Sequence, residues 1–457
     1  MHKVLKYSLI GVVALSMTSC GLYKKYEMPE STQITSDMKT AFTETPDSTS
    51  LPYLSWQQVF TDPMLQNLIR TALTNNRNLD NARLNVDIAR AQQKGAKLSY
   101  FPSVAFAPNG GGSSIGGSDM SWSYQLPLQA NWEVDVFGKL LNSKRAAEVS
   151  LEQAEYYRQS VQSQIVCGVA STYYTLVLLN QQLELTKRTA EIWKEQVESM
   201  ELMKAAARTT EAAVVQSRAN YYNILSTIPE LEHQIEVAQN ALSLMLNTMP
   251  QKWTVTSELN FDLPASLLGG VPVSYLAARP DVHAAERQMA AAYYAVNRAR
   301  AAFYPNLNIS LAGGFTNLLG SMVSNPGKWF IQLAGQLTAP LFSRGQNIAT
   351  YEAAQAQQKQ AMNTFENTVL SAAADAADAL STLRTVDRKR EYILLQIDQL
   401  QKSVEYTQDL LFSGRSTYLE VLTAQSSLLQ AQLSSLACWH TKAAAIISLY
   451  QCVGGGR

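Results

Sequence analysis

Two regions of the chain alternate between apolar and polar positions, the pattern of β-strands that have two different faces. Between residues 121 and 136 the apolar face includes Trp122, Leu128 and Val134, and the residues between them are mostly polar. Residues 329–341 repeat this alternation, and residues 306–311 form a shorter run of the same kind. We therefore expect two strands in each half of the chain, each of about 9–11 residues, which is long enough to cross a membrane.

Long tracts without proline follow these strands. One runs from Phe137 to about Ala207 and the other from Phe342 to about Phe412. If each tract is one continuous helix, it is roughly 100 Å long. Such helices cannot pack inside a compact globule, so they need lateral partners, as in a helical barrel. The residues from Leu65 to Leu98 carry apolar side chains at helical spacing, which predicts a helix ahead of the first strands.

The second half of the chain repeats the first at an offset of about 200 residues. The motif Ala-Lys-Leu-Ser-Tyr-Phe-Pro at residues 96–102 matches residues 299–305, and residues 134–139 match residues 339–345. A third pair of matching segments lies further along, where Val215 corresponds to Leu422. An interval this long exceeds that of solenoid repeats, so the chain is a duplicated domain.

The repeats, together with the N-terminal pattern described next, divide the chain into five segments. We expect a signal peptide at residues 1–19, a lipidated and extended N-terminal segment at 20–60, and the first structural repeat at 61–250. An inter-repeat linker follows at 251–275, and the second structural repeat occupies 276–457.

The N-terminus has the pattern of an export signal. Two lysines precede an apolar stretch from Tyr7 to Met17, and small residues then lead to Cys20. The stretch is too short to span a membrane as a helix. Residues 17–21 resemble a bacterial lipobox, which implies cleavage before Cys20 and attachment of lipid to that cysteine. Because Gly21 and Leu22 lack the aspartate that resembles an inner-membrane retention signal, the outer membrane is the expected location.

Four strands are too few to close a barrel, since known membrane barrels start at about eight strands. An open sheet edge in lipid costs several kcal/mol for each unsatisfied backbone group. Copies of the chain must therefore pool their strands, and two, three or four copies would supply eight, twelve or sixteen. The pattern alone leaves these alternatives open.

Composition and motifs narrow the function further. The chain has 37 basic and 37 acidic residues, and this balance gives no support for nucleic-acid binding. We find no metalloprotease, nucleophile-elbow, P-loop or paired-cysteine motif, and the histidines His233, His283 and His440 are isolated. We therefore expect no catalytic site, cofactor or metal site. An enzyme or a solute-binding lipoprotein is the alternative function that this expectation disfavours.

Three motifs carry a resemblance to a known family. They are Trp-Gln-Gln-Val-Phe-Thr-Asp-Pro-Met-Leu at residues 56–65, Trp-Glu-Val-Asp-Val-Phe-Gly at residues 132–138, and Arg-Pro-Asp-Val with Ala-Glu at residues 279–286. In this order, within a duplicated chain, they resemble the TolC/OprM-type outer-membrane efflux factors of the NodT-like lipoprotein branch. The similarity covers nearly the whole mature chain.

The resemblance implies a mainly α-helical fold with membrane strands. In this duplicated outer-membrane factor fold, each chain contributes four strands to a trimeric, twelve-stranded β-barrel that stands on a long periplasmic α-helical barrel. The implied function is the passive outer-membrane channel of a tripartite efflux system. The implied partners of the homotrimer are a periplasmic adaptor protein, an inner-membrane pump and outer-membrane lipid. The first expectation for the pump is the proton-driven RND type, and an ATP-driven pump is the alternative. The alternative is a general porin or a protein-secretion channel of similar fold.

The resemblance also identifies a tip at which each long helix folds back. In the second half the turn contains Gly414, Arg415 and Ser416, and Glu420 occupies the position where the family places an acidic residue facing the constricted pore. Three such carboxylates in a trimer would repel one another, raise their pKa and attract cations, which makes Glu420 the candidate periplasmic gate. Thr423 stands where some members have a second acid.

The matching turn of the first half departs from the family pattern. Ala207 replaces the usual glycine, and Ala213 replaces the acidic residue. Arg208 and Thr209, together with the residues of the second turn, are the candidate contacts to the adaptor.

Two further glycines lie where a strand gives way to a long helix. Gly138 and Gly345 stand at the same place in the two repeats, and such a junction requires unusual backbone angles. Pro280 suits a first helical turn, and Asp281 complements the positive end of a helix dipole. We expect these residues to have a structural role.

Overall fold

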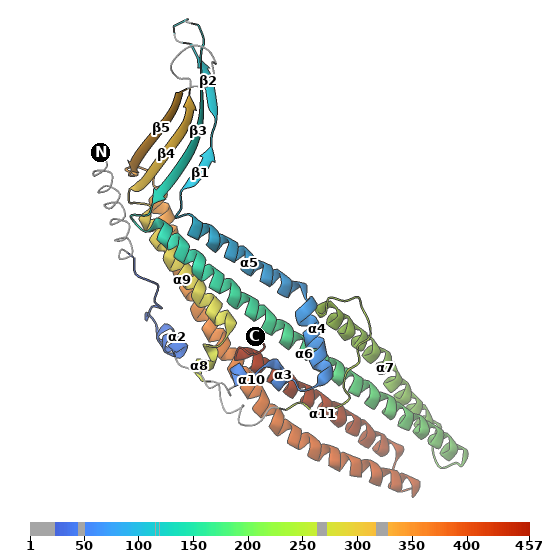
Figure 1. Cartoon of the computed structure of the whole chain (residues 1–457). Coiled ribbons are helices and arrows are strands. Elements are labelled where there is room, and N and C mark those ends of the chain that lie inside the picture. The colour runs from blue at the N-terminus through green and yellow to red at the C-terminus, as the bar shows by residue number, and fades with distance from the viewer. Residues whose placement is uncertain (1–22, 44–50, 115, 118, 263–271, 317–327) are drawn as a thin grey trace. The chain divides into compact units, whose positions relative to one another are not determined.

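The computed structural model describes residues 23–43, 51–114, 116–117, 119–262, 272–316 and 328–457 (Figure 1). The expected signal peptide and Cys20 lie outside the described residues. Besides the elements introduced below, the structure contains short helical elements at these positions: α2 (Gln33–Thr43), η2 (Leu51–Tyr53), α3 (Trp56–Val59) and α8 (Val273–Leu276).

The strands form one antiparallel sheet that joins the two repeats. β3 (Ser121–Val134) pairs with β4 (Asn306–Thr316), and β4 pairs with β5 (Lys328–Thr338). On its other side β3 pairs with β1 (Ser103–Phe106) and with β2 (Asn109–Ser113). The pairing of β3 with β4 therefore connects the first half of the chain to the second through backbone hydrogen bonds.

The number of strands differs from the expected four because the first strand is interrupted. β1 and β2 lie one after the other along β3, and Ala107 and Pro108 separate them. Pro108 has no N–H group to donate, whereas the N–H group of Ala107 still donates to the carbonyl oxygen of Pro127 at 3.1 Å. β1 and β2 thus act together as one edge strand, and the two-plus-two organisation of the sheet holds.

The two long helical tracts are continuous, as the sequence predicts. α6 (Lys139–Ala205) and α10 (Gln346–Phe412) each contain 67 residues, and each turns back into a helix of 35 residues, α7 (Glu211–Met245) and α11 (Tyr418–Cys452). At 1.5 Å per residue, α6 and α10 are each about 100 Å long. The identical lengths in the two halves show that the duplication extends to the helical hairpins.

The helix expected over Leu65–Leu98 is in fact two helices. α4 (Pro63–Asn75) is followed by its C-cap residue Asn76, and α5 (Arg77–Leu98) begins directly after Asn76. The side-chain oxygen of Asn76 accepts hydrogen bonds from the N–H groups of the residues two and three positions later, at 2.9 and 3.3 Å. Asparagine favours this capping position, and its local hydrogen bonds interrupt a pattern that helical periodicity alone treats as continuous.

In the second repeat, α9 (Pro280–Ala301) begins at the proline that the sequence assigns to a first helical turn. The carboxylate of Asp281 accepts from the N–H group of Val282 at 3.0 Å and from the guanidinium of Arg279 at 2.7 Å. These contacts fix the start of the helix that leads into β4.

The chain forms two compact units, and each unit combines segments of both repeats. The first consists of the described residues of Met1–Thr35 with Leu84–Tyr156 and His283–Asn367, and it contains the sheet. The second consists of Ser36–Arg83, the described residues of Tyr157–Val282, and Thr368–Arg457. It contains α7, α11 and the greater part of α6 and α10. The repeats are therefore units of sequence, whereas the compact units are units of packing.

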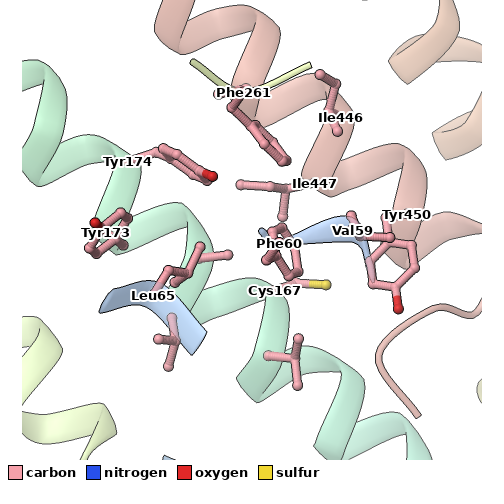
Figure 2. Packing of buried hydrophobic residues seen from close by; sticks show 14 of the residues in the cluster. Val59, Phe60, Leu65, Cys167, Tyr173, Tyr174, Phe261, Ile446, Ile447 and Tyr450 are labelled. Atoms are coloured by element: carbon pink, nitrogen blue, oxygen red, sulfur yellow. The ribbon is translucent and has the colours of Figure 1, made fainter. Parts of the chain in front are cut away.

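The largest apolar core lies in the second unit (Figure 2). Phe60, which is fully buried, stacks with Phe261 and meets the ring of Tyr450 edge-on, with both pairs of ring centroids 5.8 Å apart. Phe261 also stacks on Tyr174, with ring centroids 4.6 Å apart. Aromatic pairs of this geometry add to the stability that burial provides. The core therefore attaches residues near the start of the first repeat to α6 and α11.

Within the residues that the structure describes, none of the helices combines the length and the apolar character needed to cross a membrane.

Candidate functional site

The turn between α10 and α11 ends the long helix with a left-handed glycine. Gly414 has a φ of +72°. Its N–H group donates to the carbonyl oxygen of Leu411 at 3.0 Å, and the N–H group of Arg415 donates to that of Leu410 at 2.8 Å. This pair of hydrogen bonds is the Schellman motif, in which a left-handed residue satisfies the last carbonyl groups of a helix.

The turn between α6 and α7 has the same backbone geometry without a glycine. Ala207 has a φ of +57°. Its N–H group and that of Arg208 donate to the carbonyl oxygens of Lys204 and Met203, both at 2.8 Å. The left-handed conformation costs an alanine about 1–2 kcal/mol. The departure from glycine therefore leaves the shape of the turn unchanged but stores strain in it.

Glu420, the candidate gate, is hydrogen-bonded within its own chain at the start of α11. Its carboxylate accepts hydrogen bonds from the hydroxyl groups of Ser416 at 2.6 Å and Thr417 at 3.2 Å. Glu420 stands three residues after Thr417, the N-cap of α11, which is the spacing of a capping box. The Ser416 and Thr417 hydrogen bonds lower the pKa of the carboxyl group. Within one chain the effect on this pKa is thus opposite to the one expected from repulsion among three carboxylates.

Side chains distinguish the two turns where the backbone does not. In the first turn Lys204 and Glu211 form an ion pair, and both side chains are about half exposed. The equivalent residues of the second turn, at an offset of 207, are Leu411 and Tyr418, which are both buried. The first turn therefore has a hydrated ion pair where the second has an apolar contact.

The buried side chains of the second turn pack against the first hairpin. The hydroxyl group of Tyr418 donates to that of Ser217 on α7 at 2.7 Å, and both residues are buried. The surrounding apolar cluster draws on both hairpins and consists of Met200, Val214, Leu411, Tyr418, Val421 and Leu422. Neither the hydrophobic periodicity nor the family resemblance predicts this contact, although an alignment of the two turns places Lys204 and Glu211 opposite Leu411 and Tyr418.

The candidate adaptor contacts lie on the surface of these turns. Arg208 and Arg415 are exposed, and Thr209 and Ser416 are half-buried. The structure brings Ser416 together with Glu420. Among the described residues, no side-chain hydrogen bond or ion pair joins Arg208 or Thr209 to the second turn.

The two junction glycines both have positive φ angles, +73° for Gly138 and +76° for Gly345, and each directly precedes a 67-residue helix. A Cβ atom on Gly138 would lie 2.9 Å from the ring of Tyr23, whereas a Cβ on Gly345 would meet nothing within 4 Å. Backbone angle constrains both positions, and contact with the N-terminal segment constrains only Gly138.

The sheet presents an apolar surface of the kind that lipid requires. On β5, the exposed fractions of Trp329, Ile331, Leu333 and Leu337 lie between 66% and 70%, and these residues share one face of the strand. A row of large exposed apolar side chains indicates an interaction surface. A strand that faces lipid carries its apolar residues at every second position, as β5 does.

In the part of the chain that the structure describes, no group of three or more His, Cys, Asp and Glu residues could hold a metal ion. His283 stacks on Tyr156 with ring centroids 4.5 Å apart, and the Nε2 atom of His440 lies 3.1 Å from the hydroxyl group of Thr175. Burial lowers the pKa of His440. Each of these two histidines therefore contacts a different side chain.

Comparison with known proteins agrees with a long helical scaffold that carries a small membrane-type sheet. The family model described as "Outer membrane efflux protein" matches residues 68–248 and 271–455. The chain therefore belongs to the outer membrane efflux protein family, and the resemblance drawn from the three sequence motifs is confirmed.

Curated relatives match over almost their whole length. The chain is 28% identical to the probable outer membrane lipoprotein SilC of Salmonella typhimurium, and the alignment covers 99% of this chain and 98% of SilC. It is also 28% identical to the cation efflux system protein CusC of Escherichia coli K12, over 97% of this chain and 98% of CusC.

Solved structures have the same fold. A crystal structure of CusC superposes on this chain with a TM-score of 0.82 at 26% sequence identity. The match covers 95% of this chain and 98% of the CusC chain. The open-state MtrE channel of Neisseria gonorrhoeae is 25% identical, with a TM-score of 0.80 and coverage of 95% and 97%. The chain thus has the duplicated outer-membrane factor fold, and it is an outer-membrane efflux channel protein with a role in transport.

Proposed function

We propose that three copies of this chain form the outer-membrane channel of a tripartite efflux system. The channel conducts its cargo passively from a periplasmic adaptor and an inner-membrane pump to the cell exterior, and it is not an enzyme. Family membership and full-length similarity to efflux channel proteins support this proposal.

The observation that carries the proposal is the sheet. In the part of the chain that the structure describes, β5 pairs only with β4, and β1 and β2 pair only with β3, so both sides of the sheet end in open edges. Open edges are not tolerated in lipid, and neighbouring copies would complete the hydrogen bonding. Three copies would give the twelve-stranded barrel that the family resemblance implies.

We assign cargo selection to the pump, which we infer to be of the proton-driven RND type. The assignment of cargo selection to the pump is supported by relatives whose names give different cargoes. The cation efflux protein CusC of Escherichia coli is 28% identical to this chain, and a pyoverdine export protein and a toluene efflux protein of Pseudomonas putida are 28% and 27% identical. We propose that Arg208, Thr209, Gly414, Arg415 and Ser416 contact the adaptor, because all five lie at the turns that end the two helical hairpins.

We also propose that lipid attached to Cys20 anchors the N-terminal segment, in line with the lipoprotein name of SilC. We retain the division into a signal peptide (1–19), an N-terminal segment (20–60), two repeats (61–250 and 276–457) and a linker (251–275). Metabolic labelling with a radioactive fatty acid tests the anchor. The wild-type chain will take up label and Cys20→Ala will not, whereas labelling of the variant would refute the assignment.

The assembly is tested by light scattering of the full chain in detergent. We expect a mass of three chains and a band on denaturing gels that converts to monomer on heating. A stable monomer would contradict the proposal. In liposomes, the purified trimer will remain closed to small solutes without an adaptor, and free leakage would instead identify a porin.

We propose that Glu420 forms a ring of carboxylates at the closed end of the channel. Planar-bilayer conductance tests this role. Glu420→Gln will lower the preference for cations over anions, because it removes three negative charges from the constriction. Glu211→Gln, which removes the same charge from the other turn, is the control and will keep the wild-type preference. Unchanged selectivity in Glu420→Gln would defeat the gate assignment.

A further inference from the structure

α10 contains a segment with a strong positive charge, of which Arg384 and Arg388 lie on one face of the helix. Four of the seven residues from 384 to 390 are cations and one, Asp387, is an anion. Asp387 is already paired with Lys442 of α11 at 3.0 Å. Among the described ion pairs none includes the four cations, all of which are exposed; they are Arg384, Arg388, Lys389 and Arg390, which we call the basic segment.

A groove runs beside the basic segment. Its volume is about 490 Å³, and its lining combines small or apolar side chains, two hydroxyl groups and two guanidinium groups, from Ala377, Leu380, Ser381, Thr385, Arg384 and Arg388. Arg384 and Arg388 are four residues apart, so they project from the same face of the helix. The groove is thus lined by both apolar and cationic side chains.

α7 has the opposite charge. Between residues 219 and 251 the chain contains no lysine, arginine or aspartate but three glutamates, which are all exposed: Glu230, Glu232 and Glu236, called here the acidic segment. Glu232 is paired with Lys187 of α6 at 2.8 Å. In the described ion pairs, neither Glu230 nor Glu236 has a cationic partner.

The basic and acidic segments lie at the same level of the second unit. The apolar cluster around Tyr418 holds the two hairpin turns together, so distances along the helices can be measured from a common end. The acidic segment lies about 30–39 Å from Thr210, where α7 begins, and the basic segment about 33–42 Å from Phe412, where α10 ends. In two adjacent copies whose hairpin turns lie side by side, the acidic segment of one copy would therefore lie at the level of the basic segment of the other.

Within one chain the two segments are on opposite sides of the hairpin pair. Figure 1 shows α6 and α11 between α7 and α10. The described contacts agree, since α7 bonds to α6 through Glu232 and to α11 through Ser217, and α10 bonds to α11 through Asp387. Two complementary surfaces on opposite sides of one subunit are what a head-to-tail ring requires, because each copy presents a different surface to each neighbour.

We propose that the acidic segment of α7 in one copy of this chain docks on the basic segment of α10 in the next copy. The proposal rests on the trimeric assembly given under Proposed function, and it names the residues that set the order and level of neighbouring chains. Complementary charge would steer the copies together and disfavour like-with-like contacts.

A charge-swap experiment on the full chain tests this interface. Arg384→Glu/Arg388→Glu reverses the charge of the basic segment at the groove, and Glu230→Lys/Glu236→Lys reverses that of the acidic segment. We expect each double variant to reduce the heat-sensitive trimer in outer-membrane fractions by about tenfold or more, because like charges then face each other. The chain that carries all four substitutions will recover most of the trimer, because the opposite charges then meet again in exchanged positions.

A matched control separates the interface from a general effect of charge. Lys94→Glu/Lys359→Glu changes two exposed cations outside the segments by the same net charge and will keep the trimer. The inference is overturned if either reversed variant assembles like the wild type, if the fourfold variant does not recover, or if the control loses as much trimer. A wild-type chain that is itself monomeric would instead refute the proposed function, so the two failures are distinguishable.

Discussion

The two hairpin turns have the same backbone but different side chains, and the comparison separates what shapes a turn from what holds it in place. Both turns place a left-handed residue after a 67-residue helix and form the same two backbone hydrogen bonds. The first has the strained Ala207 and an exposed ion pair, whereas the second has Gly414 and the buried Tyr418. The backbone conformation of the turn therefore accepts either alanine or glycine. The buried side chains of the second turn, and not its backbone, attach it to the other hairpin.

The strongest test of this difference is the removal of the aromatic ring. Tyr418→Ala will lower the free energy of local unfolding at the tip by about 3 kcal/mol, because it empties a buried aromatic site. Tyr418→Phe, which removes only the hydrogen bond to Ser217, will cost about 1 kcal/mol. Hydrogen exchange of the amide groups in both hairpins measures these effects. Glu211→Ala, at the equivalent place in the first turn, serves as the control and will cost less than either variant.

A substitution at the left-handed position of the second turn has the next largest effect. Gly414→Ala will destabilise the tip by about 1–2 kcal/mol, because alanine is strained at this φ angle. A Cβ atom at this position would meet nothing within 4 Å, so the cost is conformational and not steric. A loss of less than a few tenths of a kcal/mol in hydrogen exchange would show that the turn can relax without a left-handed residue.

The reciprocal substitution in the first turn should stabilise it. Ala207→Gly relieves the strain of the positive φ angle, and the greater freedom of glycine in the unfolded chain offsets part of the gain. We expect a net stabilisation of up to about 1 kcal/mol, measured by exchange of the amide groups around Arg208. An unchanged or weakened turn would mean that the left-handed alanine is not strained.

Acidification has the smallest effect and acts through the carboxylates of the two turns. Hydrogen bonds from Ser416 and Thr417 lower the pKa of Glu420, and Lys204 lowers that of Glu211. Each carboxylate therefore stabilises its turn fully above the ordinary value of 4.5 and loses this effect as the pH falls through its lowered pKa. Amide exchange at the tip will accelerate below about pH 4.5 beyond its intrinsic pH dependence. Glu420→Gln will remove this response from the second turn only, and a response that persists there would exclude Glu420 as its source.

The sequence predicts correctly those features that produce a regular pattern along the chain. Alternation located the strands, the absence of proline located α6 and α10, and the offset between halves revealed the duplication. The predicted boundaries of strands and helices are wrong where the hydrogen bonding of a single residue interrupts an element that the apolar pattern presents as continuous. Pro108 divides the first strand because it lacks an N–H group, and Asn76 divides the first helix because its side chain caps the next one.

The sequence by itself thus determined the class of protein, the paired organisation of strands and helices, and the positions of both turns. The period of apolar residues and the torsional limits of glycine and proline act locally, so they can be read without coordinates. Only the tertiary structure decided that Tyr418 meets Ser217 across the two hairpins, and that Glu420 accepts hydrogen bonds from Ser416 and Thr417 at the start of its own helix. These features depend on which helix faces which, and that is settled by packing between residues that are far apart in the chain.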